Sequence, residues 1–157
     1  MRRVLTIATA LVLIFSAESF NVIQQQPELK WEGWNSGYKR GISENKIILV
    51  DAYTDWCGWC KKMDRETYSD PEIIKKINKH FVAIKFNPEL NQTYYIDTTA
   101  YTGRELHAML SKEYRTGYPT TYFILPQNNK LFINPGYEDP QRFSETLDKM
   151  VAEAGLK

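Results

Sequence analysis

The hydrophobic residues of this chain fall into two patterns, continuous runs and helically spaced positions. Residues 47–53 form a nearly continuous apolar run rich in β-branched side chains, and residues 81–86 and 120–125 form two more. Runs of this kind are typical of strands that are covered on both faces. Residues 140–154 instead place their apolar side chains on one face of a helix. The pattern predicts an α/β fold.

Helical segments separate the predicted strands, and turn signals mark their ends. Asp70, Pro71 and Glu72 supply an N-cap, a first-turn proline and a first-turn acid. Residues 127–129 predict a turn, after which the chain returns antiparallel. In chain order we expect a weak helix at 35–45, a strand at 47–53, helices at 58–68 and 71–79, a strand at 81–86, a helix at 104–114, strands at 120–125 and 130–133, and a helix at 140–154.

Two segments show no clear period. Residues 20–34 are expected to form a lead-in that Trp31 and Trp34 anchor onto the domain. Residues 88–103 place tyrosines among polar residues and predict a long loop or irregular insertion. A chain of 157 residues is about the size of one domain, so we expect a single domain at 35–157.

The first 19 residues have the pattern of a secretory signal peptide. A basic start precedes an uninterrupted apolar run from Val4 to Phe15, and Ala17 and Ser19 form a small-x-small end. The run is shorter than the roughly 20 residues that cross a bilayer. We expect cleavage after Ser19, or else after Ala17; the alternative is a buried first strand or an uncleaved anchor. Cleavage predicts an exported protein, located in the periplasm or outside the cell.

The overall charge is balanced, with 20 Lys and Arg against 19 Asp and Glu. Such a chain lacks the strong field that would attract nucleic acid or an anionic membrane, so neither is an expected partner. Apolar residues make up 43% of the chain and aromatic residues 13%. This is enough to fill a core, which argues against a disordered chain.

The only two cysteines, Cys57 and Cys60, lie within four positions of each other. A bond across so short a ring removes little entropy from the unfolded chain, so chemistry explains the pair better than stabilisation. Cys57 lies where a predicted strand meets a predicted helix, and the helix dipole and free amide hydrogens there favour a thiolate. Cys60, one turn later, can attack the mixed disulfide that Cys57 forms with a partner.

The cysteine pair has two other interpretations. A structural zinc site needs four ligands, and the chain adds only His80 and His107, which lack motif spacing. We therefore expect no metal, and we expect each histidine to be a surface residue or a hydrogen-bonded helix residue. The second alternative is a pair that is permanently oxidised and inactive.

Two segments of the chain resemble the thioredoxin-like superfamily. Val50-Asp51-Ala52-Tyr53-Thr54-Asp55-Trp56-Cys57-Gly58-Trp59-Cys60-Lys61 is similar to the active-site segment, and Tyr118-Pro119-Thr120 is similar to the cis-proline loop. The Asp-Trp-Cys start and the step Ser69-Asp70-Pro71-Glu72 are more similar to exported and DsbD-type domains than to cytosolic thioredoxin. The resemblance implies a thioredoxin-like fold, with helices flanking a central mixed β-sheet and an insertion before the cis-proline loop.

The resemblance also implies roles for residues near the cysteines. Cys57 is expected to be the nucleophile and Cys60 the resolving thiol. Asp51 matches a buried acid that moves a proton to or from the resolving cysteine, and burial would raise its pKa toward neutrality. Lys85 matches a lysine beside that acid. The alternatives are an acid facing water at the strand end and a lysine on an exposed strand face.

The remaining matches imply a surface that binds the substrate. Pro119 is expected to follow a cis peptide bond, and Tyr118 to contact an extended substrate segment through its backbone. Trp56 and Trp59 are expected to flank the thiols as an apolar docking surface, with Trp59 exposed and Gly58 also contacting the substrate. The alternative is that either tryptophan is an ordinary core residue. Thioredoxin has proline where this chain has Trp59, and the residues between the cysteines tune the redox potential.

Together these features predict an exported thiol-disulfide oxidoreductase that acts on cysteines of other exported proteins. We expect a reductase or isomerase rather than an oxidant, fed by a membrane electron donor of the DsbD type. The redox-active pair Cys57–Cys60 is expected to need no cofactor, and the protein is expected to be a monomer. The alternative is a non-catalytic binding or chaperone-like module with an inert disulfide.

Overall fold

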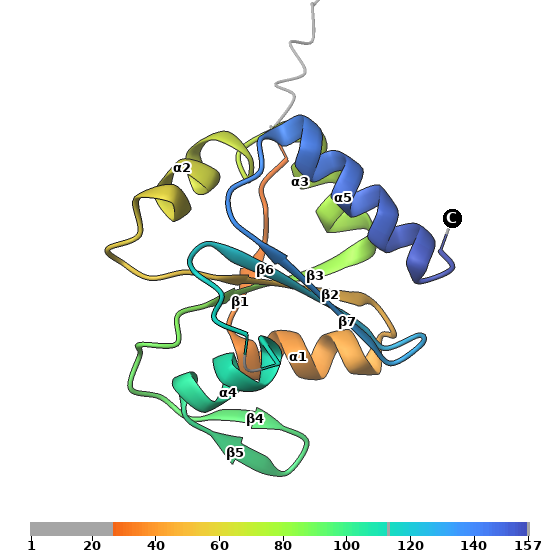
Figure 1. Cartoon of the computed structure of the whole chain (residues 1–157). Coiled ribbons are helices and arrows are strands. Elements are labelled where there is room, and N and C mark those ends of the chain that lie inside the picture. Colours follow the sequence, from red (N-terminus) through yellow and green to blue (C-terminus); the bar gives the residue numbers. More distant parts are fainter. Residues whose placement is uncertain (1–26, 113, 157) are drawn as a thin grey trace, which may run out of the picture.

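A five-stranded sheet lies between two layers of helices (Figure 1). The computed structural model describes residues 27–112 and 114–156, so the predicted signal peptide at 1–19 lies outside the described residues. In chain order the elements are β1 (Trp31–Glu32), α1 (Trp34–Ser43), β2 (Ile47–Ala52), α2 (Gly58–Glu66), α3 (Pro71–His80), β3 (Phe81–Phe86), β4 (Tyr94–Ile96), β5 (Thr99–Tyr101), α4 (Gly103–Leu110), β6 (Thr120–Leu125), β7 (Lys130–Pro135) and α5 (Pro140–Glu153).

The sheet is mixed, with the strand order β1-β3-β2-β6-β7. Strand β3 runs parallel to both β1 and β2, whereas β6 runs antiparallel to β2 and to β7. All residues of β2 are buried because helices cover both of its faces, which explains its continuous apolar run. The predicted strands and helices are confirmed, and their ends shift by no more than about two residues except in α4.

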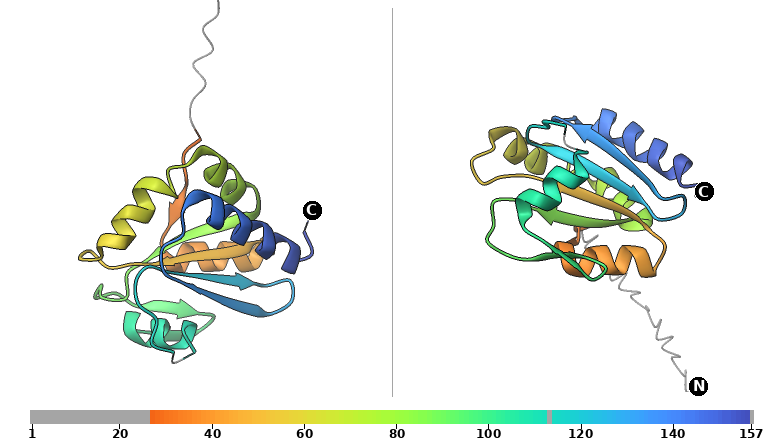
Figure 2. Two further views of the ribbon diagram at one scale, coloured as in Figure 1. Left: turned by 45° about the horizontal axis from the view of Figure 1, so that its top comes forward. Right: turned by 60° about the horizontal axis from the view of Figure 1, so that its bottom comes forward.

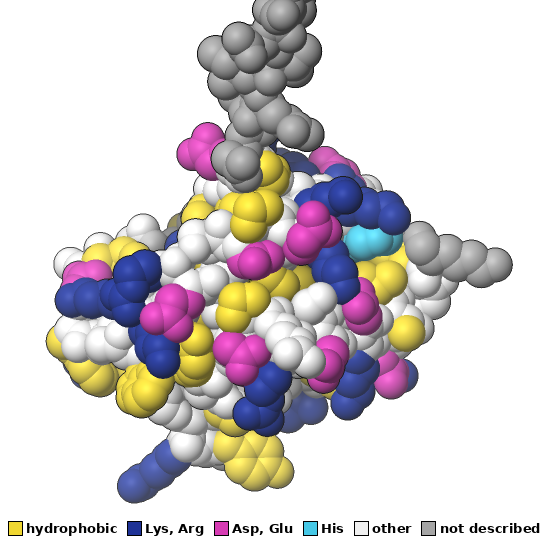
Figure 3. Space-filling view, turned by 90° about the horizontal axis from the view of Figure 1, so that it is seen from above, with side chains coloured by type: hydrophobic (Ala, Val, Ile, Leu, Met, Phe, Trp, Pro, Cys, Tyr) yellow, Lys and Arg dark blue, Asp and Glu magenta, His cyan; other side chains and the backbone are white. Residues whose placement is uncertain are grey.

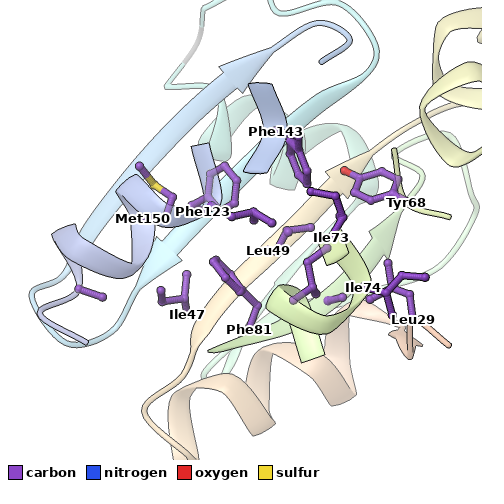
Figure 4. Packing of buried hydrophobic residues seen from close by; sticks show 14 of the residues in the cluster. Leu29, Ile47, Leu49, Tyr68, Ile73, Ile74, Phe81, Phe123, Phe143 and Met150 are labelled. Atoms are coloured by element: carbon purple, nitrogen blue, oxygen red, sulfur yellow. The ribbon is translucent and has the colours of Figure 1, made fainter. Parts of the chain in front are cut away.

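Each face of the sheet carries its own hydrophobic cluster. Helices α2, α3 and α5 contribute to one cluster, and α1, α4 and β4 contribute to the other (Figures 1 and 2). The neighbouring β6 residues Tyr122 and Phe123 belong to opposite clusters, because successive side chains of a strand point to opposite faces. Figure 4 shows Phe123, Phe143 and Tyr68 between the sheet and the covering helices. Burial of these large apolar side chains stabilises both layers.

Helix α1 forms despite two glycines in its interior, which confirms the weakest helix prediction. A Cβ atom on Gly37 would lie 2.6 Å from Cγ1 of Ile84, and a Cβ atom on Gly41 would overlap Ile48. The two glycines therefore let the helix lie close against β2 and β3. Their contact with the sheet offsets the low helix propensity that weakens the pattern in the sequence.

The predicted lead-in contains a short strand that the sequence pattern did not indicate. Trp31 and Glu32 form β1 and pair with Ala83 and Ile84 at the edge of the sheet. Two residues are too few to show an alternating pattern, which explains why the strand was missed. The predicted anchor Trp34 is buried, with 1% of its surface exposed.

The predicted irregular insertion at 88–103 contains a hairpin, so this prediction was wrong in part. Strands β4 and β5 pair antiparallel, from Tyr94 opposite Tyr101 to Ile96 opposite Thr99. Tyr94 is 1% exposed and packs edge-to-face on Phe86, and its hydroxyl donates to the backbone oxygen of Asn87. Tyr94 thus packs the hairpin against the end of β3, and hydrogen bonds from Trp34 and Asn35 also join it to α1. No local period reveals these long-range contacts.

Helix α4 is shorter than predicted, since it ends at Leu110 rather than near Tyr114. Its start is fixed by a capping box between Thr102 and Glu105. After the C-cap, Lys112 has a φ of 51°, in the left-handed region that commonly ends helices. The chain therefore turns away before Tyr114, toward the predicted cis-proline loop.

Replacing Gly103 by alanine is expected to destabilise the fold. A Cβ atom there would meet the backbone of Pro88, at 2.8 Å from its Cα, and a backbone contact cannot move aside as a side-chain tip can. We expect a loss of about 1–3 kcal/mol in the free energy of unfolding, the usual cost of overpacking. Urea unfolding measures it, with Gly117→Ala as the control because no atom lies within 4 Å of that position. Equal stability of the two variants would contradict the close contact.

The surface over α2, α3 and α5 carries no large field of one sign. Figure 3 shows basic and acidic side chains interspersed over this face. One pair joins α3 to α5, with Lys76 Nζ 2.6 Å from Asp148 Oδ1. The interspersed signs agree with the balanced composition. Among the described residues, no helix has the length and apolar character that crossing a membrane requires.

Candidate active site

The two cysteines lie at the junction between β2 and α2, as predicted. Cys57 is the N-cap of α2, and it forms a disulfide with Cys60 in the first turn. The backbone N–H of Cys60 donates to Cys57 Sγ over 3.0 Å. The sulfur of Cys57 thus takes the place of a capping oxygen at a helix N-terminus. Once the bond is reduced, the same amide and the helix dipole favour the thiolate form of Cys57.

The cis-proline loop lies beside this junction. The peptide bond between Tyr118 and Pro119 is cis, which confirms the prediction. Thr120, the next residue, pairs with Ala52 at the end of β2 that leads to the cysteines. The Tyr118 ring meets Trp56 edge-to-face, with ring centroids 5.9 Å apart. The fold therefore brings together two motifs that are about 60 residues apart in the chain.

Asp51 and Lys85 occupy paired positions on the neighbouring strands β2 and β3. Lys85 Nζ lies 2.6 Å from Asp51 Oδ2, and it also binds the carboxylate of Asp64 on α2. Asp51 is 1% exposed, whereas its second oxygen, Oδ1, has no hydrogen-bond partner among the described residues. The structure thus decides against both alternatives, an acid facing water and a lysine on an open strand face. Sequence reasoning missed Asp64, because only the fold brings α2 over β3.

Burial raises the pKa of the Asp51 carboxyl, and the positive charge of Lys85 opposes this rise only in part. Tyr68 lies nearby, and burial together with the charge of Asp51 raises its pKa well above 10.0. Its hydroxyl pairs with Thr121 Oγ1 over 3.3 Å. Asp51 is therefore a buried acid with one oxygen held by a cation and one oxygen free to hold a proton.

Two tryptophans flank the cysteines on the surface. Trp56 is 67% exposed and Trp59 is 58% exposed, as expected for Trp59, whereas Cys57 is only 4% exposed. The indole N–H of Trp56 donates to the carboxylate of Glu89, with 3.0 Å between Nε1 and Oε2. Nothing lies within 4 Å of a Cβ atom built on Gly58, so the backbone between the tryptophans is open. A partner that reaches Cys57 has to pass over this aromatic surface.

Glu89 and His107 are two further residues at the site, and the sequence did not point to either. Glu89 follows β3 and fixes the Trp56 indole from the side of the insertion. The His107 ring stacks on Tyr118, with centroids 5.3 Å apart, and burial lowers its pKa. His107 is half-buried at the surface, as the prediction allowed, whereas its Nε2 atom is buried without a hydrogen-bond partner among the described residues. The signal available was its place in a helix just before the cis-proline loop.

Within the part of the chain that the structure describes, no group of three or more His, Cys, Asp or Glu side chains could hold a metal ion. The reactive and titratable groups at the site are the cysteine pair, the buried acid and the lysine. The cysteine pair can carry out disulfide exchange, and the acid and the lysine can donate and accept protons.

Comparison with known proteins gives a family match over most of the chain. The Thioredox_DsbH model, described as "Protein of unknown function, DUF255", matches residues 12–152. The chain is 27% identical over 116 residues to the thiol:disulfide interchange protein DsbD of Haemophilus influenzae strain PittGG. The matched segment covers 71% of this chain and 18% of that protein. The chain thus spans less than a fifth of the length of this curated relative.

Solved structures with the same fold include a thioredoxin from Thermus thermophilus. It has a TM-score of 0.65 at 19% identity, and the match covers 82% of this chain and 91% of that one. A structure described as a DsbH oxidoreductase has a TM-score of 0.59 at 21% identity, and the match covers 84% of this chain and 93% of that chain. At these identities the likeness establishes the thioredoxin-like fold.

Proposed function

The chain belongs to the Thioredox_DsbH family, and we propose that it is a thiol-disulfide oxidoreductase that reduces or isomerises disulfides of other exported proteins. The observation that carries this proposal is the N-cap position of Cys57, where the backbone N–H of Cys60 donates to its sulfur. A cysteine in this position has its thiolate favoured, and a second cysteine three residues later can resolve the intermediate.

The proposed reaction passes two electrons from the reduced pair to a partner disulfide. The Cys57 thiolate attacks one partner sulfur, a mixed disulfide forms, and the other partner sulfur leaves as a thiolate that takes up a proton. Cys60 then loses its proton and attacks Cys57 Sγ, so that the Cys57–Cys60 disulfide forms and the second partner sulfur leaves as a thiol. The protein is oxidised and the partner reduced. A membrane electron donor of the DsbD type would return the pair to the dithiol form.

Asp51 and Lys85 are proposed to serve the second step. Cys60 has to lose a proton before it can attack, and burial raises the pKa of Asp51, which makes its carboxylate a better proton acceptor than an exposed one. Lys85 holds one oxygen of this carboxyl in place over 2.6 Å, which leaves Oδ1 to carry the proton. The ammonium group also stabilises the carboxylate that forms when the proton moves on.

The exposed aromatic surface beside Cys57 is proposed to dock the partner. Trp56, Gly58 and Trp59 would lie under the segment that carries the partner disulfide, and the backbone of Tyr118 would pair with that segment in an extended conformation. The ring contact between Tyr118 and Trp56 and the pairing of Thr120 with Ala52 support this proposal. Large exposed aromatic side chains contribute strongly to binding at such surfaces.

Export to the periplasm or the cell exterior is part of the proposal. It rests on the basic start, apolar run and small-x-small end of residues 1–19. In an oxidising compartment a lone thiol pair has to be reduced repeatedly to act as a reductant, which agrees with the need for a membrane donor. The exported protein would act as a monomer.

A measured reduction potential tests this proposal against the inert alternative. We expect the Cys57–Cys60 pair to equilibrate with glutathione at a potential closer to the roughly −270 mV of thioredoxin than to the roughly −120 mV of the strong oxidant DsbA. The wild-type protein should also reduce insulin when a dithiol is supplied. A potential below about −300 mV together with an unshifted Cys57 pKa near 8.5 would instead identify an inert structural bond.

A further inference from the structure

A surface pocket of about 360 Å³ is lined in part by Tyr118, whose ring also contacts Trp56 next to the cysteine pair. It is formed by the start of the insertion, by one face of α4 and by the segment that leads into the cis-proline loop. The side chains that matter for its chemistry are Glu89, Arg104, His107, Arg115 and Tyr118. None of these except Tyr118 has a part in the exchange reaction proposed above, so the pocket calls for a separate explanation.

The charges that line the pocket favour an anion. Arg104 and Arg115 are both exposed, and within the described residues neither forms an ion pair. Glu89 is the acidic group in the described lining, and its carboxylate accepts the indole N–H of Trp56. Burial lowers the pKa of His107, so its ring is neutral near pH 7. Among the described lining residues, two guanidinium groups therefore lie with one carboxylate, which already accepts a hydrogen bond, so the described lining carries a net positive charge.

Contacts between successive aromatic side chains connect the pocket to the active site. His107 stacks on Tyr118 at 5.3 Å, Tyr118 meets Trp56 at 5.9 Å, and Trp56 precedes Cys57 in the chain. Glu89, which lies in the insertion and lines the pocket, also accepts the indole N–H of Trp56. One wall of the pocket is thus the same Tyr118 whose backbone we propose to pair with the partner segment.

We propose that this pocket selects partner proteins by binding an acidic side chain close to the reactive cysteine of the partner. The proposal rests on the proposed function and adds a substrate preference to it. Successive side chains of an extended segment point in opposite directions, about 3.3 Å further along the chain at each residue. When the partner cysteine turns toward Cys57, a neighbouring side chain turns past Tyr118 toward Arg104 and Arg115. A carboxylate there gains charge-assisted hydrogen bonds, and a lysine is repelled.

The pocket is large enough for one acidic side chain of a partner, and it shares Tyr118 with the proposed docking surface. A volume of about 360 Å³ is at the small end of the range for pockets that enclose drug-sized ligands, which runs from about 300 to 1,000 Å³. One acidic side chain and part of its backbone fit such a space, and the rest of the partner can lie along the exposed tryptophans. We therefore assign the pocket to a polypeptide partner.

The test compares peptides that differ only in charge beside one cysteine. Each peptide carries its cysteine as a mixed disulfide with 2-thiopyridine, and Asp, Asn or Lys stands on one side of the cysteine or the other. Attack of the Cys57 thiolate on the peptide sulfur releases pyridine-2-thione, whose absorbance gives the rate; Cys60 then releases the peptide thiol. We expect the Asp peptide to react about tenfold faster than the Lys peptide on at least one side, with the ratio reduced by salt.

Charge variants identify the pocket as the source of the preference. The double variant Arg104→Glu and Arg115→Glu should reverse the preference, and the milder Arg104→Gln and Arg115→Gln should abolish it. Arg142→Glu is the matched control, because Arg142 lies in α5 on the opposite face of the sheet and should leave the preference intact. Circular dichroism and urea unfolding check that each variant is folded.

The remaining outcomes overturn the proposal in distinguishable ways. Equal rates of the wild type with the Asp, Asn and Lys peptides would refute the pocket assignment, and so would a preference that remains in the double variants of Arg104 and Arg115. In both cases the release of thione would still support the proposed function. A charge effect that appears only in the reduction of oxidised glutathione would assign the pocket to a small molecule instead. Release of thione by the wild type no faster than in buffer would refute the proposed function and the pocket assignment with it.

Discussion

A Cys57→Ser variant is expected to reduce insulin no faster than the dithiol does without protein. Cys57 Sγ is the sulfur at the N-terminus of α2, and the backbone N–H of Cys60 is already directed at it. A serine hydroxyl keeps the capping geometry, so the fold should survive. It cannot replace the thiolate as the attacking group in disulfide exchange. The rate of insulin precipitation, with the wild type measured in parallel, gives the comparison.

Cys60→Ser is the matched variant for this experiment. It keeps the attacking thiolate and removes the resolving thiol, so we expect it to form a mixed disulfide with the partner and to stop there. Non-reducing electrophoresis would show the trapped species for Cys60→Ser and not for Cys57→Ser. Trapping by Cys57→Ser alone would mean that the roles are reversed. Insulin reduction by Cys57→Ser at the wild-type rate would exclude the cysteine pair as the active group.

An Asp51→Asn variant is expected to slow the second step of exchange far more than the first. Asp51 is buried, its Oδ1 lacks a partner among the described residues, and its pKa is raised by burial. These are the properties of a group that can accept the proton of Cys60 and pass it on, and an amide cannot do this. We expect resolution of the mixed disulfide to slow by about 100-fold, the low end of what a positioned acid or base contributes.

Rapid-quench measurements separate the two steps, since formation and resolution of the mixed disulfide give different products. In the wild type, the resolution rate should rise with pH as Asp51 ionises, and this rise should be lost in Asp51→Asn. Asp64→Asn is the matched control, because it also removes a carboxylate from Lys85 but leaves Asp51 in place, and it should slow resolution less. Equal slowing of both steps in Asp51→Asn would contradict the proton-transfer role.

The same Asp51→Asn variant should be more stable than the wild type at pH 7. Folding raises the pKa of the Asp51 carboxyl above its unfolded value, near 3.8. Its contribution to the free energy of unfolding is therefore fully present below pH 3.8, and it is lost as the pH rises through the pKa of the folded state. Replacement by a neutral amide removes this loss, so the gain in unfolding free energy should be present at pH 7 and disappear toward pH 3.8. A stable but slow variant would show that Asp51 is kept for chemistry and that the variant is folded.

The elements of the domain could be predicted where a local pattern repeats often enough. The buried run at β2, the N-cap and proline before α3, and the turn before β7 each contain their own signal within a few residues. The insertion hairpin and β1 were missed because they depend on contacts with distant residues, Tyr94 with Phe86 in the first case and Trp31 with Ala83 in the second. Gly37 and Gly41 look unfavourable for a helix until the sheet beneath them is known.

Only those residues of the site that lie in recognisable motifs could be predicted from the sequence. The segment from Asp51 to Cys60 and the loop at Pro119 are recognisable as short strings of residues. The contacts of Glu89 with Trp56 and of His107 with Tyr118 join residues between 11 and 33 positions apart, and no string of letters contains them. The positive pocket beside Tyr118 could be found only after α4 and the insertion had been placed.

By itself, the sequence determined the reactive pair, its position at a strand–helix junction and the alternation of strands and helices around it. These features depend on neighbouring residues, because backbone propensity, capping and the helix dipole act over one or two turns. The resemblance had put Lys85 beside Asp51, and the tertiary structure decided this against the alternatives. The tertiary structure alone showed that Asp64 shares this lysine and that Arg104 and Arg115 line a pocket next to Tyr118. Charge interactions and burial depend on distance in space, and the order of strands in the sheet sets those distances.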